Sequence, residues 1–229
     1  SWGGREIGRL VRLGFIALLL IALTGCSFLS SPGGKVYVPP RDIETPPQAP
    51  KEPDKNLDVT DGFDFPVGDR DGRGWGVTGY AFLDWSTSSN SLHPGEDWNI
   101  PGAGNGDYGQ PVYSIANGRV RHSLWNSALG HVVVIEHQLP DGTKVWSQYA
   151  HLAERWVVPG EKVARRQQIG TVGRGPNNRF TAHLHFEIRR YELAANAWPR
   201  TNGVAWPAEK VQQYWLHPSA FIARNRPSH

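Results

Sequence analysis

The globular part of the chain is predicted to be mainly β, an antiparallel curved sheet or open barrel with little helix. Residues 182–190 alternate strictly between apolar and polar side chains, which is the pattern of a strand with two different faces. Two apolar runs, residues 131–137 and 144–149, flank an Asp-Gly pair that favours a hairpin turn. The best helix candidate is the short segment 208–214, so we expect strands to form the core.

The other predicted elements are short. Residues 110–116 and 119–124 flank an Asn-Gly pair at 117–118, and we expect this pair to form the two-residue turn of another hairpin, because it accepts positive φ values. Residues 157–160 and 168–173 are extended pieces bounded by turn residues. Several short antiparallel strands of this kind are typical of a barrel or sandwich.

Composition excludes several classes of protein. The 229 residues are 39% hydrophobic and 20% charged, which is enough apolar material for one or two folded domains and too much for a disordered chain. The net charge is +3, but residues 1–25 hold three arginines and one glutamate, which leaves +1 for the remainder. No basic stripe is left for nucleic acid, so we expect no nucleic-acid partner. The single cysteine excludes a metal site built on several thiolates.

Residues 1–25 are predicted to be a lipoprotein signal peptide. A basic segment precedes an eleven-residue apolar run at 13–23, which is shorter than the roughly 20 residues of a spanning helix. The tetrad Leu-Thr-Gly-Cys ending at Cys26 resembles the lipobox of bacterial lipoproteins. That resemblance implies cleavage before Cys26, lipidation of its thiol and attachment to a membrane, the outer membrane facing the periplasm if the cell is Gram-negative. The alternative is a plain anchor with an incidental free thiol.

Residues 26–57 are predicted to be the lipidated cysteine and a proline-rich tether. Six prolines lie between residues 36 and 56, among charged residues with little apolar material. Such a segment favours extended polyproline II, with a reach on the order of 60 Å at about 3.1 Å per residue. The folded domain is then expected over residues 58–224.

Three clusters of polar residues are candidates for a functional site. His183 and His185 are two residues apart on a predicted strand, so their side chains leave the same face about 6.6 Å apart. His93 and Asp97 flank a Pro-Gly pair, which excludes a helix and requires a turn to bring them together. His151 follows the end of another predicted strand. Each cluster alone is more often packing or chance, and it is their combination that indicates a site.

In this order the three motifs resemble those of the M23 family of peptidases, the lysostaphin-like or LytM-type zinc endopeptidases. The motifs are His-x-Gly-x-Asp at 93–97, Tyr-x-His-Leu at 149–152 and His-Leu-His-Phe-Glu at 183–187. The resemblance extends over about residues 62–190 and implies a mainly β peptidase domain.

The resemblance also implies roles for five side chains. His93, Asp97 and His185 would bind one zinc ion, and three protein ligands leave a fourth position for water, as in catalytic zinc sites. His151 and His183 would be the catalytic pair, one taking a proton from the water and the other donating a hydrogen bond to the oxyanion. Which histidine has which role stays open at this point.

The implied function is hydrolysis of peptide cross-links in bacterial peptidoglycan, and thus remodelling of the cell wall, with peptidoglycan as the partner. The alternative is a catalytically silent M23-like envelope module that binds and activates other wall hydrolases. Retention of all five site positions favours the enzyme. Further protein partners in the envelope stay open, as do the bond that is cut and the oligomeric state.

Several neighbouring residues have competing interpretations. Glu96 is expected to be solvated in a turn, and Glu187 to orient an imidazole or to form an edge salt bridge. A glycine-rich loop at 102–109 and the segment 179–182 depart from the family pattern, and we expect both to affect substrate preference. Four tryptophans are candidates either to line a groove or to fill the core, namely Trp75, Trp85, Trp98 and Trp146.

Overall fold

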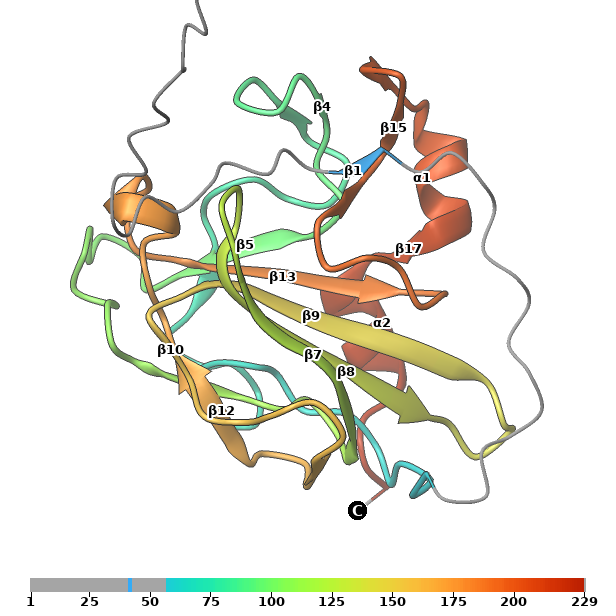
Figure 1. Ribbon diagram of the computed structural model, residues 1–229. Coiled ribbons are helices and arrows are strands. Elements are labelled where there is room, and N and C mark those ends of the chain that lie inside the picture. The colour runs from blue at the N-terminus through green and yellow to red at the C-terminus, as the bar shows by residue number, and fades with distance from the viewer. Residues whose placement is uncertain (1–40, 43–56, 229) are drawn as a thin grey trace, which may run out of the picture. The chain divides into compact units, whose positions relative to one another are not determined.

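The computed structural model of the chain describes residues 41–42 and 57–228 (Figure 1). Cys26, the predicted signal peptide and most of the predicted tether lie outside these described residues. The described part is mainly β, with antiparallel sheets and two α-helices, α1 (Ala208–Tyr214) and α2 (Pro218–Arg224), which confirms the predicted fold class. In this part of the chain no helix is both long enough and apolar enough to cross a membrane.

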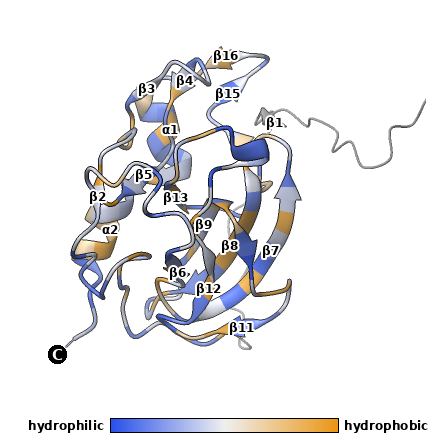
Figure 2. Ribbon diagram, turned by 90° about the vertical axis from the view of Figure 1, so that its left-hand side faces the viewer, coloured by the Kyte–Doolittle hydropathy of each residue, from blue (hydrophilic) through white to orange (hydrophobic). Residues whose placement is uncertain are grey.

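The central feature is an eight-stranded antiparallel sheet whose three longest strands lie side by side and curve together (Figures 1 and 2). Each of these strands has nine residues, and hydrophobic and hydrophilic residues alternate along β7. In order the strands are β11 (Lys162–Val163), β7 (Gly118–Asn126), β8 (Gly130–Gln138), β9 (Lys144–Leu152), β13 (Leu184–Arg189), β5 (Glu96–Asn99) and β2 (Gly76–Val77), with β17 (Trp215–Leu216) pairing with the end of β13.

Smaller sheets border the central one. A three-stranded sheet contains β10 (Glu154–Arg155), β12 (Gln168–Thr171) and β6 (Pro111–Tyr113). The remaining elements are the hairpins β3 (Trp85–Ser86) with β4 (Ser91–Leu92) and β15 (Arg200–Thr201) with β16 (Val204–Ala205), the parallel pair β1 (Arg41–Asp42) with β14 (Ala197–Trp198), and the 3-10 helix η1 (Pro176–Asn178).

The hairpin predicted at the Asn-Gly pair is wrong. β6 pairs with β12 instead, while β7 begins at Gly118 and pairs with β8 and β11. Gly118 does not adopt a positive φ. A Cβ atom there would lie 2.3 Å from the carbonyl oxygen of Glu136, so the glycine is required by the close approach of β8 and not by a turn. The predicted extended piece at 157–160 contains no strand, whereas residues 168–171 form β12.

The hairpin predicted at the Asp-Gly pair is confirmed. β8 and β9 are joined by residues 139–143, where Gly142 has φ 84° and the Thr143 N–H donates to Asp141 Oδ1 at 2.8 Å. The predicted helix 208–214 is confirmed as α1. Helix α2 was not predicted, since it is only seven residues long and begins at a proline.

Both faces of β13 are buried, although only one is apolar. Leu184, Phe186 and Ile188 lie in the main core, which also includes residues of α2. On the opposite face Glu187 and Arg189 are fully buried as well. Charged groups are seldom buried without partners, so this face must be satisfied internally, and it is the face that carries the candidate site.

A buried histidine in β8 gives the fold a pH dependence. His137 donates from Nδ1 to the carbonyl oxygen of Asn117 at 2.9 Å, and its Nε2 lies 2.7 Å from Ser147 Oγ. Burial lowers its pKa from 6.5 to about 4. The unfolded chain therefore binds more protons than the folded chain between these two pH values.

Because the pKa is lowered on folding, His137 contributes its full stability above about pH 6.5 and loses it as the pH falls to about 4. We expect the free energy of unfolding of the metal-free protein to drop by about 3 kcal/mol more over this range in wild type than in His137→Gln. Denaturant titrations at four pH values measure the difference. Equal slopes for the two proteins would contradict the expectation.

Candidate metal centre

Two neighbouring strands and one turn bring three predicted ligands together. β5 and β13 are antiparallel neighbours, and their register places Asp97 directly opposite His185. His93 lies between β4 and β5 and is returned toward the sheet by the Pro-Gly turn. A Cβ atom on Gly95 would lie 2.4 Å from the carbonyl oxygen of Phe186, so only glycine allows this turn to pack against β13.

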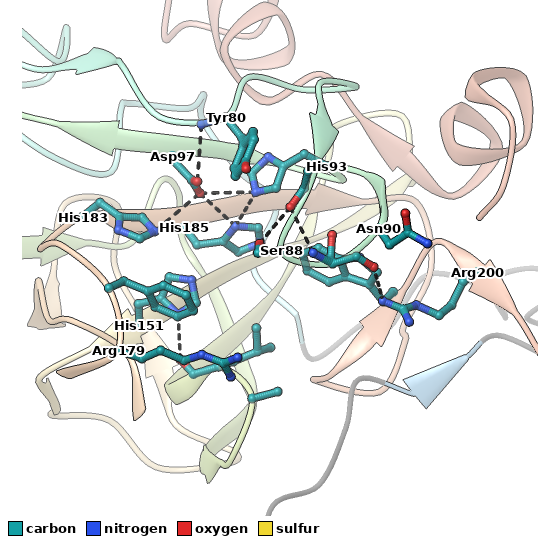
Figure 3. Close-up of a pocket in the computed structure, with 16 residues that line it drawn as sticks. Tyr80, Ser88, Asn90, His93, Asp97, His151, Arg179, His183, His185 and Arg200 are labelled. Carbon is teal, nitrogen blue, oxygen red and sulfur yellow. Dashed lines mark hydrogen bonds and ion pairs between the residues drawn. The ribbon is translucent and has the colours of Figure 1, made fainter. Parts of the chain in front are cut away.

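The side chains of the three residues meet at one point (Figure 3). His93 Nε2 lies 3.0 Å from His185 Nδ1 and 3.3 Å from Asp97 Oδ1, and the last two atoms are 3.1 Å apart. All three residues are buried, and their ligand-type atoms lie within 4.8 Å of one another. Two imidazoles and one carboxylate are a donor set that suits Zn²⁺, with a fourth position left for water or substrate. The residues present therefore fit the implied metal.

Outer hydrogen bonds determine which nitrogen atoms face the centre. His93 Nδ1 lies 2.8 Å from the carbonyl oxygen of Gly95, and His185 Nε2 lies 2.8 Å from Glu187 Oε1. Both partners accept only, so these nitrogens carry the protons. The other nitrogens, His93 Nε2 and His185 Nδ1, are then the atoms that would bind a metal ion. Asp97 is held by the Tyr80 N–H, which donates to its Oδ2 at 3.4 Å.

The centre stabilises positive charge. Burial alone would raise the pKa of Asp97, but His93 and His185 outweigh it and hold the pKa of this carboxyl well below its usual range. Burial would lower the pKa of His185, but hydrogen bonds to Asp97 and Glu187 outweigh burial and raise this pKa to about 9. Surroundings that stabilise a proton on His185 Nδ1 also stabilise a metal cation at that atom. The metal ion must displace the proton in order to bind.

The predicted catalytic pair lies beside this centre. His183 Nε2 is 3.7 Å from Asp97 Oδ1, and the rings of His151 and His183 are 4.8 Å apart between centroids. His151 Nδ1 donates to the carbonyl oxygen of Leu129 at 2.9 Å, and His183 Nδ1 donates to that of Thr181 at 2.7 Å. In each histidine Nδ1 is therefore occupied by a hydrogen bond, and Nε2 is the nitrogen available to exchange a proton or bind substrate. The structure brings together all five residues that the sequence singled out (Figure 3).

The backbone at His151 is unusual. The register between β8 and β9 shifts between Val133 and His131, so β9 bulges where it passes His151. His151 has φ 63°, a left-handed conformation that residues other than glycine rarely adopt and that gathers at functional sites. Burial, and after it the neighbouring His183 and His185, lower the pKa of His151 well below its usual value. The ring is therefore neutral at pH 7, with Nε2 able to accept a proton.

The five residues line a pocket of about 480 Å³. One wall also contains Trp198, whose ring is 5.7 Å from that of His185 and whose Nε1–H donates to Ser91 Oγ at 2.6 Å. The sequence offered no signal that separated this tryptophan from the other nine. None of the four tryptophans named as groove candidates lines this pocket, and Trp98 and Trp146 are buried in hydrophobic clusters.

The glycine-rich loop 102–109 does not line this pocket. The loop instead holds the backbone just before His183, because Asn105 Oδ1 accepts a hydrogen bond from the Ala182 N–H at 2.9 Å. From the segment 179–182, Arg179 and Phe180 do line the pocket.

The predicted environment was wrong for Glu96 and right for Glu187. The expectation that Glu96 is solvated is wrong, because it lies in β5, is 1% exposed and accepts from Trp98 Nε1 at 3.1 Å. Glu187 orients an imidazole, as expected. It also accepts hydrogen bonds from Arg189 Nε and Trp215 Nε1, both at 2.7 Å. Burial would raise the pKa of Glu187, but Arg189 and His185 outweigh burial and lower this pKa to about 2.

Glu187→Gln should weaken both the metal centre and the fold. Removal of the charge loosens the orientation of His185, which typically costs about 10- to 100-fold in metal affinity. It also leaves Arg189 without its buried partner, which costs roughly 3–5 kcal/mol of stability. A zinc competition titration and a denaturant titration measure the two effects. The exposed Glu209→Gln is the matched control, and wild-type zinc affinity in Glu187→Gln would contradict the account.

The fold and site together define a mainly β domain with a candidate single-metal centre. Residues 92–197 match the family model described as Peptidase family M23. Lipoprotein NlpD of Yersinia enterocolitica is 34% identical over 87 residues, which cover 37% of this chain and 81% of that protein. The chain belongs to peptidase family M23.

Two curated relatives from Vibrio cholerae are longer proteins. Peptidoglycan DD-endopeptidase ShyC is 35% identical over 115 residues, covering 50% of this chain and 24% of the relative. Peptidoglycan DD-endopeptidase ShyA is 34% identical over 118 residues, which cover 45% of this chain and 25% of that relative. The chain thus spans about a quarter of the length of each.

Solved structures with a similar fold include a zinc containing peptidase from Vibrio cholerae, with 26% identity, a TM-score of 0.45, and coverage of 59% of this chain and 38% of that one. The catalytic domain of lysostaphin from Staphylococcus simulans has 20% identity and a TM-score of 0.47. The match covers 63% of this chain and 90% of that domain.

Proposed function

We propose that the protein is a zinc-dependent endopeptidase that hydrolyses peptide cross-links of bacterial peptidoglycan. The observation that carries the proposal is the meeting of His93, Asp97 and His185 within 4.8 Å, beside His151 and His183, which each keep Nε2 for chemistry. The two relatives named peptidoglycan DD-endopeptidases support the choice of substrate.

The chain supplies the groups that such a reaction needs. A zinc ion at this centre provides Lewis acidity, which polarises a carbonyl group and lowers the pKa of a water molecule. His93 Nε2, Asp97 and His185 Nδ1 would hold the ion, and the hydrogen bond from His185 Nε2 to Glu187 keeps His185 in the required orientation.

The two remaining histidines divide the proton chemistry. Neutral His151 accepts a proton at Nε2 from the attacking water and later returns it to the leaving amine, because its Nδ1 is already engaged by Leu129. His183 Nδ1 donates to the carbonyl oxygen of Thr181, so Nε2 carries a hydrogen only when the ring is doubly protonated. In that form His183 donates a hydrogen bond from Nε2 to the oxyanion. This assignment makes His151 the general base and His183 the oxyanion donor.

The test is digestion of intact sacculi by the full-length protein, loaded with zinc and kept soluble in detergent. We expect soluble muropeptides, and mass spectrometry of the fragments identifies the bond that is cut. If the zinc-loaded protein leaves sacculi intact and instead stimulates a separate amidase, the protein is the silent activating module and the enzymatic proposal is wrong.

We also propose that Cys26 carries a lipid that anchors the protein in the cell envelope. The lipobox-like tetrad supports this, and one relative is named a lipoprotein. Labelling of wild type with radioactive palmitate, and no labelling of Cys26→Ser, is the expected result. Equal labelling of the two would contradict it.

A further inference from the structure

Two arginines line the pocket together with the five site residues. Arg179 follows η1, and Arg200 lies in β15 (Figure 3). Arg179 lies beside His151, whereas Arg200 lies on the far side of the pocket beside Ser88 and Asn90. Two cationic side chains therefore flank the reacting centre from opposite sides.

The charge of the pocket is unbalanced. Among the residues that the structure describes, the lining contains one carboxylate, that of Asp97, and this carboxylate is already engaged by His93 and His185. Each guanidinium group brings one positive charge to the pocket, and a bound zinc ion would add two more. The pocket thus favours anionic ligands over neutral ones.

Arg200 is held in a fixed position. The side chain is half-buried, and Nη2 donates to the carbonyl oxygen of Ser89 at 2.7 Å. The described residues beside it are polar and uncharged, namely Ser86, Ser88, Ser89 and Asn90. A fixed guanidinium among hydroxyl and amide groups suits a carboxylate on an extended peptide, because the peptide backbone can bond to the neutral groups.

Arg179 is the second arginine of the pocket. It is exposed at the rim of the pocket, and no carboxylate in the described part of the chain forms an ion pair with it. Its guanidinium carbon lies 5.9 Å from the centroid of the Phe180 ring. By contrast, five other arginines pair with carboxylates, namely Arg73, Arg121, Arg165, Arg189 and Arg226.

We propose that Arg179 and Arg200 bind free carboxylates of the peptide substrate on either side of the scissile bond, and so select acidic cross-linked peptides over neutral ones. This inference rests on the proposed endopeptidase function and specifies the substrate class of that same pocket. Arg179 belongs to the segment 179–182, which we expected from the sequence to affect substrate preference.

The test uses two versions of one cross-linked muropeptide dimer, with its side-chain carboxylates either free or converted to carboxamides. Charge-assisted arginine–carboxylate bonds are strong, so we expect wild type to prefer the free acid by about 10-fold in kcat/KM, mainly through KM. Arg179→Gln and Arg200→Gln should each reduce this preference, and the double variant should abolish it. Activity toward the carboxamide should fall less than activity toward the free acid in each variant, because the carboxamide substrate lacks the charge that the arginines recognise.

A matched control and a second readout make the test independent of catalysis. Arg224→Gln removes an exposed arginine of α2 that does not line the pocket, and it should keep the wild-type preference. In a zinc-loaded, inactive His151→Ala background, calorimetry should show the same preference in Kd and its loss in Arg179→Gln. Because Arg179 is exposed, this variant is expected to fold even if Arg200→Gln does not.

The outcomes separate this inference from the proposed function. If wild type cleaves the two dimers equally, or if the double variant keeps the 10-fold preference, the arginine proposal is overturned while the endopeptidase assignment stands. If wild type cleaves neither dimer nor sacculi, the endopeptidase assignment fails, and the calorimetric comparison then decides whether the arginines bind carboxylates.

Discussion

His151→Ala should keep its zinc and lose about 10²- to 10⁴-fold in kcat. In the proposed mechanism the imidazole accepts and returns the proton, and it does not belong to the set of ligand-type atoms within 4.8 Å. Burial keeps the pKa of His151 low and the ring neutral, so the proton-accepting form is present at neutral pH. Steady-state kinetics on a muropeptide and metal analysis by mass spectrometry check the two halves of the prediction.

The left-handed backbone at this position calls for a second variant. His151→Asn tolerates φ 63° better than alanine does, so it removes the imidazole with less backbone strain. We expect the same loss of turnover in both. His122→Ala, which changes a half-buried histidine outside the pocket, should retain wild-type turnover. Wild-type kcat in His151→Asn would show that His151 is not the general base.

His185→Ala should lose both zinc and turnover. His185 Nδ1 lies 3.0 Å from His93 Nε2 and 3.1 Å from Asp97 Oδ1, so it would be one of three donors to the proposed ion. Two remaining ligands hold zinc weakly, and we expect less than about one tenth of the wild-type zinc after dialysis against a chelator. His122→Ala again serves as the control, and full zinc occupancy in His185→Ala would contradict the ligand assignment.

The sequence predicted the strands that have strong local signals. β13 has strict alternation, and the β8–β9 hairpin has an Asp-Gly turn between two apolar runs. The hairpin prediction at the Asn-Gly pair was wrong because glycine occurs for two different structural reasons. At Gly118 the missing side chain allows a neighbouring strand to approach, and nothing in the local sequence distinguishes that use from a turn.

The candidate site was predicted largely through the resemblance of three motifs to a family. Spacing alone placed His183 and His185 on one face of a strand, but it could not place Asp97 opposite His185, which depends on strand register. Burial of Glu96 was missed because it depends on contacts with α2, where Ser219 Oγ donates to its carboxylate. Trp198 was missed because its position in the pocket wall depends on tertiary packing.

We propose that His93, Asp97 and His185 bind one zinc ion between them. An anomalous difference map, recorded above the zinc absorption edge from crystals grown with zinc, tests this ligand set. We predict a single peak about 2.0–2.2 Å from His93 Nε2, His185 Nδ1 and a carboxylate oxygen of Asp97, with His151 and His183 beyond bonding distance. No peak at this position, or a peak bound by His151 or His183 in place of Asp97, would contradict the account.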